Sequence, residues 1–165
     1  MKRLLVAIVL LALPAAGGGA WWWLRGSLPD LDGEWALPGL HGPVEIVSDG
    51  HGVPHVYARD TDDAWFAAGA LHARDRLWQM ELYRRATAGR LAEALGEEVL
   101  PIDRRMLTLG IRAAADAEFS RLGGSARVAL TRYADGVNAA MATMQGRRRP
   151  AELQLLGLTP AAWTP

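Results

Sequence analysis

The sequence predicts an α+β fold in which a β-hairpin is followed by about four helices. Two β-rich runs flank a glycine-containing turn within residues 43–58, and beyond residue 60 apolar residues recur at spacings of three and four. The chain has 165 residues and is 50% hydrophobic, which is enough for one domain with a core. Because a lone hairpin is only marginally stable, the pattern indicates the front part of a larger fold.

Composition excludes two classes of function. The chain carries 18 basic and 18 acidic residues, so it lacks the basic excess typical of proteins that bind nucleic acids. It contains no cysteine, which excludes disulfides and thiolate metal sites.

The amino terminus has the layout of an export segment. Lys2 and Arg3 precede a ten-residue apolar run, and the 21 residues 4–24 are uncharged and end in a tryptophan cluster. That length suits a membrane crossing, whereas Gly18-Gly19-Ala20 offers a cleavage site. We interpret residues 1–24 as a signal anchor or a signal peptide. The remainder is then expected on the periplasmic face of the inner membrane, or free in the periplasm after cleavage.

The segments between this export segment and the first long helix are short. Residues 25–42 are rich in Gly, Pro and Asp and are interpreted as a linker. Within 43–58 the turn Asp49-Gly50-His51-Gly52 predicts a hairpin, and Pro54 marks an edge or the start of its second strand.

Helices are predicted over most of the remaining chain. Asp60 or Thr61 caps the first, a short helix covers residues 90–95, and a third begins at Pro101 and ends at Gly123-Gly124. Ser125 is expected to cap the fourth. After it come a basic turn, a short β-like run and a Pro-rich end.

Histidine and serine residues are the first candidates for chemistry. His51 and His55 flank the hairpin turn near Asp49, but their spacing matches no known ligand pattern, and His72 has no nucleophile nearby in sequence. The serines are better explained without catalysis, including those of the two Gly-Ser pairs, and no G-x-S-x-G motif occurs. These serines are Ser27, Ser48, Ser120 and Ser125.

The stretch HARDRLWQMELYRR, residues 72–85, places a carboxylate in an apolar stripe. Leu71, Trp78 and Leu82 share a helical face with Asp75, which is therefore expected to be buried. A buried carboxylate is either a perturbed catalytic group or a structural one paired with arginine, and the many nearby arginines favour the structural role. The expected partners are Arg85, Arg104 or Arg105.

Residues 43–96 resemble the start of the penicillin acylase (penicillin amidase) family. The matching pieces include Asp49, Gly52-Val53-Pro54-His55, the core of the 72–85 stretch, Arg84-Arg85 and Gly89-Arg90-Leu91-Ala92-Glu93. YADGVNA at 133–139 and LLGLTPAAWTP at 155–165 also fit. The resemblance extends over residues 43–165.

The resemblance implies an N-terminal-nucleophile hydrolase with a four-layer αββα fold, made as a precursor that cleaves itself. In that family a new amino-terminal residue, usually serine, attacks an amide and its own α-amine serves as the base. Residues 43–165 then correspond to an incomplete amino-terminal (α-chain) part. The scissile bond, the oxyanion donors and any calcium ligands of the complete enzyme are expected beyond Pro165.

We therefore assign no catalytic, cofactor-binding or metal-binding residue to this chain. The resemblance implies a small-molecule amide as substrate, such as a β-lactam or an N-acyl homoserine lactone, and the β-chain region of the same precursor as partner. The 72–85 helix is expected to hold the framework. The alternative is a non-catalytic helical binding module, anchored in the membrane through residues 4–24.

Overall fold

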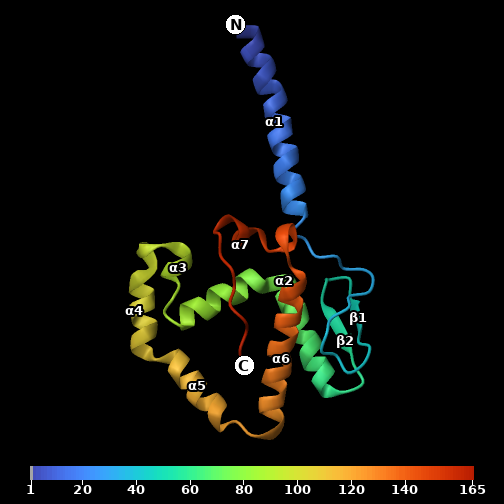
Figure 1. Ribbon diagram of the computed structural model, residues 1–165, viewed down its shortest axis with the longest axis vertical. Coiled ribbons are helices and arrows are strands. Elements are labelled where there is room, and N and C mark those ends of the chain that lie inside the picture. The colour runs from blue at the N-terminus through green and yellow to red at the C-terminus, as the bar shows by residue number, and fades with distance from the viewer. Residues whose placement is uncertain (1) are drawn as a thin grey trace.

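The computed structural model describes residues 2–165, with side chains from Leu11 onward. The elements are α1 (Lys2–Arg25), β1 (Glu45–Ser48), β2 (Pro54–Tyr57), α2 (Thr61–Thr87), α3 (Ala92–Leu95), the 3-10 turn η1 (Glu97–Val99), α4 (Leu100–Leu109), α5 (Ile111–Arg121), α6 (Gly124–Thr143), the 3-10 turn η2 (Gly146–Arg148) and α7 (Ala151–Leu155). Figure 1 shows α2 and α6 crossing at the centre, the hairpin on one side and the α3–α5 arm on the other, while α1 projects away. The predicted combination of one hairpin with several helices is confirmed.

The hairpin forms where the glycine-rich turn predicted it. Strands β1 and β2 are antiparallel, with Glu45 opposite Tyr57. Asp49 closes the turn, because its Oδ1 accepts hydrogen bonds from the backbone N–H groups of His51 at 2.8 Å and Val53 at 3.0 Å. Pro54 begins β2, as its missing N–H group led us to expect.

Helix α2 begins at the predicted cap but does not stay straight. The Asp60 carboxylate accepts a hydrogen bond of 2.8 Å from the backbone N–H of Asp63. Farther along, Arg76 has φ −141° and ψ 22°, which lies outside helical geometry and kinks the helix. The buried positions Phe66, Ala70, Ala73, Leu77 and Glu81 nevertheless keep spacings of three and four across the kink, so one face of α2 stays inward along its length.

The core lies along the contact between α2 and α6. Gly69 faces the backbone of Tyr133, and Gly136 faces the backbone of Phe66, and a Cβ atom at either glycine would overlap the opposing carbonyl oxygen. These two glycines let the helix backbones touch. Small and branched side chains complete the seam, and these are Ala70, Ala73, Leu77, Val137, Ala140 and Leu153.

Three predictions about the helical part are wrong. The helix expected from Pro101 to residue 122 is two helices, because Gly110 adopts φ 66° and ends α4 in the left-handed region. Ser125 lies inside the first turn of α6, where Gly123 occupies the cap position without a side-chain bond. The β-like run near the carboxyl end is the short helix α7.

The predicted membrane segment finds no support. Within the part of the chain that the structure describes, no helix is both long enough and apolar enough to cross a membrane. The prediction concerned residues 4–24, and the side chains of residues 4–10 lie outside the described part.

Replacing Gly136 by alanine is predicted to destabilise the fold by ~2 kcal/mol, because overpacking at backbone contact forces α2 and α6 apart. This loss exceeds the gain of about 1 kcal/mol that alanine brings to a helix interior. The measurement is the melting temperature by circular dichroism. Gly50→Ala is the matched control, since a Cβ at Gly50 meets nothing within 4 Å. Equal melting temperatures for the two variants would contradict the close α2–α6 contact.

Candidate functional site

A cleft runs beside the kink of α2. It has a volume of about 1090 Å³ and lies between the end of α1, the hairpin turn, α2 and the start of α7. His51, His72 and Asp75 all line it. The structure therefore brings together three of the residues that the sequence singled out, although it does not bond them to one another.

The prediction of a buried Asp75 is wrong. Its side chain is 34% exposed and pairs with the adjacent Arg74, whose Nε donates to Oδ1 at 2.7 Å and whose Nη2 donates to Oδ2 at 3.2 Å. None of the three expected partners (Arg85, Arg104 or Arg105) takes part. The physical reason is the position of the buried face, which runs through Ala70, Ala73, Leu77 and Glu81 at spacings of three and four and leaves Asp75 outside it.

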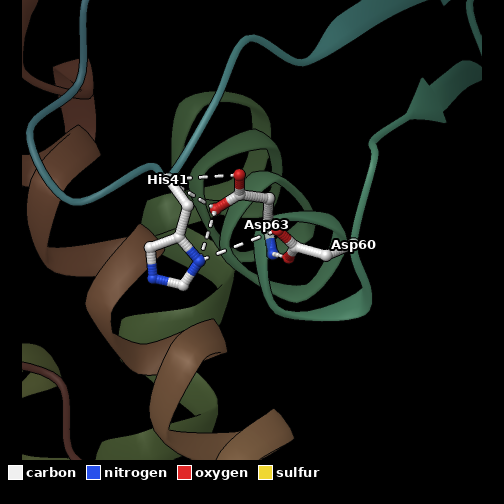
Figure 2. A group of neighbouring side chains, drawn as sticks. All are labelled: His41, Asp60 and Asp63. Carbon is white, nitrogen blue, oxygen red and sulfur yellow. Dashed lines mark hydrogen bonds and ion pairs between the residues drawn. The ribbon is translucent and has the colours of Figure 1, made fainter.

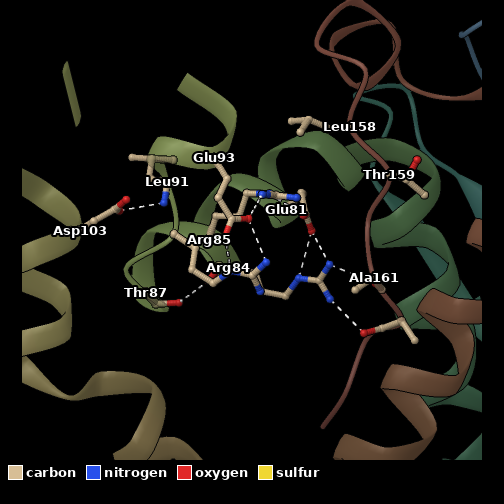
Figure 3. A network of polar contacts seen from close by, with 12 residues as sticks. Glu81, Arg84, Arg85, Thr87, Leu91, Glu93, Asp103, Leu158, Thr159 and Ala161 are labelled. Atoms are coloured by element: carbon tan, nitrogen blue, oxygen red, sulfur yellow. Dashed lines mark hydrogen bonds and ion pairs between the residues drawn. The ribbon is translucent and has the colours of Figure 1, made fainter. Parts of the chain in front are cut away.

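The buried carboxylate of the 72–85 stretch is Glu81, which is 1% exposed. Two arginines neutralise it: Arg84 donates to Oε2 through Nε at 3.0 Å and Nη2 at 2.5 Å, and Arg85 donates to Oε1 at 2.7 Å. Figure 3 shows both arginines converging on the one carboxylate. A carboxylate that uses both oxygens in this way serves as a structural tie.

This tie connects segments that are distant in sequence. Arg85 continues to Glu93 of α3 at 2.7 Å, while Arg84 reaches the backbone near the carboxyl end. Asp103 of α4, also buried, accepts bonds of 2.8 Å from the backbone N–H groups of Leu91 and Ala92 and so fixes the start of α3. The expectation that the 72–85 helix holds the framework is therefore met by Glu81 in place of Asp75.

The histidines form separate pairs. His55 Nε2 lies 3.4 Å from Asp49 Oδ2, and the backbone bonds from Val53 and His51 hold the pKa of Asp49 below its ordinary value. His72 Nδ1 lies 2.8 Å from the hydroxyl of Tyr133, and burial raises the pKa of Tyr133. These pairs link neighbouring elements and do not assemble the metal ligand set that was considered around His51 and His55.

A different cluster was missed by sequence reasoning. His41, Asp60 and Asp63 place one ligand atom each within 4.8 Å of one another, as Figure 2 shows. The only signal of this cluster in the sequence was the presence of Asp60 and Asp63 at the start of α2. His41 comes from the segment interpreted as a linker, so nothing local predicted the contact.

This cluster is a structural clamp. The Asp63 carboxylate, 2% exposed, accepts bonds from the backbone N–H groups of His41 at 3.0 Å and Gly42 at 2.9 Å, and from Arg132 at 3.1 Å. Burial pushes the pKa of Asp63 upward, but these hydrogen bonds and the charges of His41 and Arg132 outweigh burial and hold the pKa below its ordinary value. Arg132 already supplies the positive charge that a metal ion would bring.

The serines are not activated by neighbouring groups. Ser27 and Ser120 donate to backbone carbonyls of their own helices or turns, at 2.7 Å and 2.9 Å. Among residues 11–165, whose side chains are described, no serine hydroxyl is hydrogen-bonded to a histidine or a carboxylate. The hydroxyls of Ser27 and Ser120 therefore bind the backbone of their own segments.

Replacing Asp63 by asparagine is predicted to reduce stability by about 1–3 kcal/mol near pH 7, because it removes a charge-assisted anchor for three donors. The pKa of Asp63 is lower in the folded state, so its stabilisation is complete above about pH 4 and fades as the pH falls through the folded pKa. Denaturant unfolding at pH 7 and pH 3 measures this. The difference from wild type should shrink at pH 3 for Asp63→Asn, and should be small at both pH values for the neighbouring Asp62→Asn. A pH-independent difference would contradict the clamp.

Comparison with known proteins places this geometry in context. The penicillin amidase family model matches residues 43–165. The chain is 43% identical over 142 residues to penicillin acylase 2 proenzyme of Pseudomonas sp., and 35% identical over 138 residues to penicillin G acylase of Escherichia coli. It is 36% identical over 139 residues to an acyl-homoserine lactone acylase of Pseudomonas aeruginosa.

These alignments include most of the chain but little of each relative. They extend over 86%, 79% and 84% of this chain, and over 18%, 16% and 16% of the three relatives in the same order. A solved structure of a thermostable penicillin G acylase from Alcaligenes faecalis superposes with a TM-score of 0.66 at 28% identity, over 74% of this chain and 66% of that one. The matched motifs, the shared fold and the family match over residues 43–165 show that this chain belongs to the penicillin amidase family.

Proposed function

We propose that this chain is the amino-terminal part of an amidohydrolase that cleaves linear amides. The complete protein would carry the four-layer αββα fold and would be made as a precursor whose internal cleavage creates the nucleophile. The substrates would be small amides with an apolar acyl group, penicillins or N-acyl homoserine lactones among them. The β-chain region of the same precursor would be the partner of residues 43–165.

One observation carries this proposal: 43% identity over 142 residues to a penicillin acylase proenzyme. The other relatives are named as a penicillin G acylase and acyl-homoserine lactone acylases, which supports amide hydrolysis without choosing the acyl group. Since the chain spans about a fifth or less of these relatives, the activity belongs to the proposal for the complete protein.

The geometry supports a structural role for this part of the proposed enzyme, with the catalytic groups located elsewhere in the complete protein. The described residues hold three buried carboxylates, and each is satisfied by arginines or backbone donors, so none is free to move a proton. The part of the enzyme that performs chemistry would therefore be built elsewhere, and this part would supply its support. The alternative of a membrane-anchored binding module has no supporting observation.

We also propose that the amino-terminal segment directs export to the periplasm. Its support is the basic pair Lys2 and Arg3 ahead of an apolar run, with small residues at 18–20. Expression in a Gram-negative host followed by osmotic shock is predicted to release or expose the protein on the periplasmic side. Amino-terminal sequencing then locates any cleavage, for example a mature end at Trp21. Retention in the cytoplasm would contradict export.

A chimera tests the enzymatic proposal. Residues 43–165 of this chain replace the matching segment in the Pseudomonas penicillin acylase 2 proenzyme. The chimera is predicted to hydrolyse penicillin G or an N-acyl homoserine lactone. The isolated 165-residue chain is predicted to be inactive, because no activated nucleophile exists among its described residues. Hydrolysis is followed by release of the primary amine.

Two controls accompany this experiment. The recipient proenzyme with the segment deleted should be inactive, and any turnover by the isolated chain should be compared with its Ser27→Ala and Ser125→Ala variants. A chimera that melts cooperatively yet hydrolyses neither substrate would contradict the proposed function. Turnover by the isolated chain that disappears in either serine variant would contradict the proposed structural role.

A further inference from the structure

Residues 158–163, here called the strap, cross α2 and α6 in an extended path without belonging to a helix or strand. Arg84 of α2 holds the strap at one side. Its Nη2 donates to the carbonyl of Ala161 and its Nη1 to the carbonyl of Ala162, both at 3.1 Å, and its Cζ lies 4.6 Å from the centre of the Trp163 ring. Figure 3 shows this guanidinium between Glu81 and the strap.

Helix α6 holds the strap from the other side. The Asn138 amide group donates to the carbonyl of Trp163 at 2.9 Å and accepts from its backbone N–H at 2.7 Å, in the manner of a paired strand. At the other end of the strap, Arg149 donates to the carbonyl of Leu158. The backbone of the strap is therefore fixed at both ends, by Arg149 at Leu158 and by Asn138 at Trp163.

Arg84 is fixed before it meets the strap. Its bonds to the buried carboxylate of Glu81 immobilise the guanidinium, so little further entropy is lost when it binds the carbonyl groups and stacks on the ring. The planar fork is necessary for this geometry, because one face meets Trp163 while separate N–H groups meet Glu81 and two carbonyls. A lysine offers a single charged point and cannot do all three.

We propose that Arg84 is a positioning residue that sets the direction in which the polypeptide leaves the α2–α6 pair at Trp163. The carboxylate of Glu81 orients the guanidinium, and the guanidinium orients the strap. This inference goes beyond the proposed function and does not depend on amide hydrolysis. If the proposed function holds, the same contact directs the polypeptide that follows Pro165 in a complete enzyme.

Arg85 provides a matched control. It binds the same carboxylate at 2.7 Å from the next position of the helix, but its other contact is Glu93 of α3 and it does not touch the strap. Arg84→Lys and Arg85→Lys therefore both weaken the pairing of Glu81, and only the first removes the contact with the strap. A role in stability alone predicts the same behaviour for the two variants.

The test is a distance measurement on the full chain by pulsed electron paramagnetic resonance. Since the chain has no cysteine, spin labels can be attached at Thr164→Cys and Ser125→Cys, both exposed sites. Ser125 lies thirteen residues before Asn138 along α6, which is roughly 20 Å and within the range of the method. The parent chain should give one narrow distance distribution. Arg84→Lys should give a broader distribution, because the strap then keeps only its bonds to Asn138 and Arg149, while Arg85→Lys should stay narrow even with a lower melting temperature.

Each outcome decides the proposal. A narrow distribution in Arg84→Lys overturns it, and equal broadening in both variants also overturns it, because the effect would then come from Glu81 alone. If Arg84→Lys does not fold, Arg84→Gln is measured instead, since Arg85 still pairs with Glu81 and only the guanidinium that binds the strap is removed. Broadening there supports the proposal and a narrow distribution overturns it. No outcome depends on activity, so failure of the chimera would leave this result unaffected.

Discussion

The contact between the backbones of α2 and α6 is the constraint on which the other elements depend. Gly69 and Gly136 face each other's helices, so the two axes approach more closely than side chains would normally allow. Small side chains such as Ala70, Ala73 and Ala140 are buried in this core together with the larger Leu77 and Val137. The hairpin, the α3–α5 arm and the strap then attach to the edges of this pair, as Figure 1 shows.

Buried carboxylates make these attachments. Asp63 joins the lead-in at His41 and Gly42 to α2 and, through Arg132, to α6. Glu81 and its two arginines join α2 to α3 and to the strap. Asp103 joins α4 to the start of α3. A fold with a small apolar seam is thereby fixed by charged ties, and each of the three carboxylates is hydrogen-bonded because a buried charge without partners costs several kcal/mol.

Local signals predicted local structure well. The turn at Asp49, the strand start at Pro54 and the cap at Asp60 each depend on a few neighbouring residues. The turn was predicted, and the other two were among the alternatives predicted for those positions. Predictions failed where geometry depends on something farther away. Packing against α6 decides which face of α2 is buried. The sequence pattern of Leu71, Trp78 and Leu82 placed Asp75 inside, whereas the buried face runs through Ala73, Leu77 and Glu81. His41 was likewise unpredictable, because its partners lie some twenty residues onward.

These contacts explain the role of the residues between 72 and 93 that resemble the penicillin amidase family. Glu81, Arg84, Arg85 and Glu93 are the members of one hydrogen-bonded network, whereas Asp75, the more conspicuous carboxylate in the sequence, has an adjacent arginine and partial access to water. A sequence shows which charged residues are near one another along the chain, but it does not show which carboxylate is buried in the folded protein. Burial makes Glu81 the structural carboxylate, because a desolvated charge needs strong hydrogen-bond donors and finds them in Arg84 and Arg85. The guanidinium of Arg84, fixed by Glu81, can then orient the strap. These residues therefore mark the part of the framework where α2 controls the path of the strap.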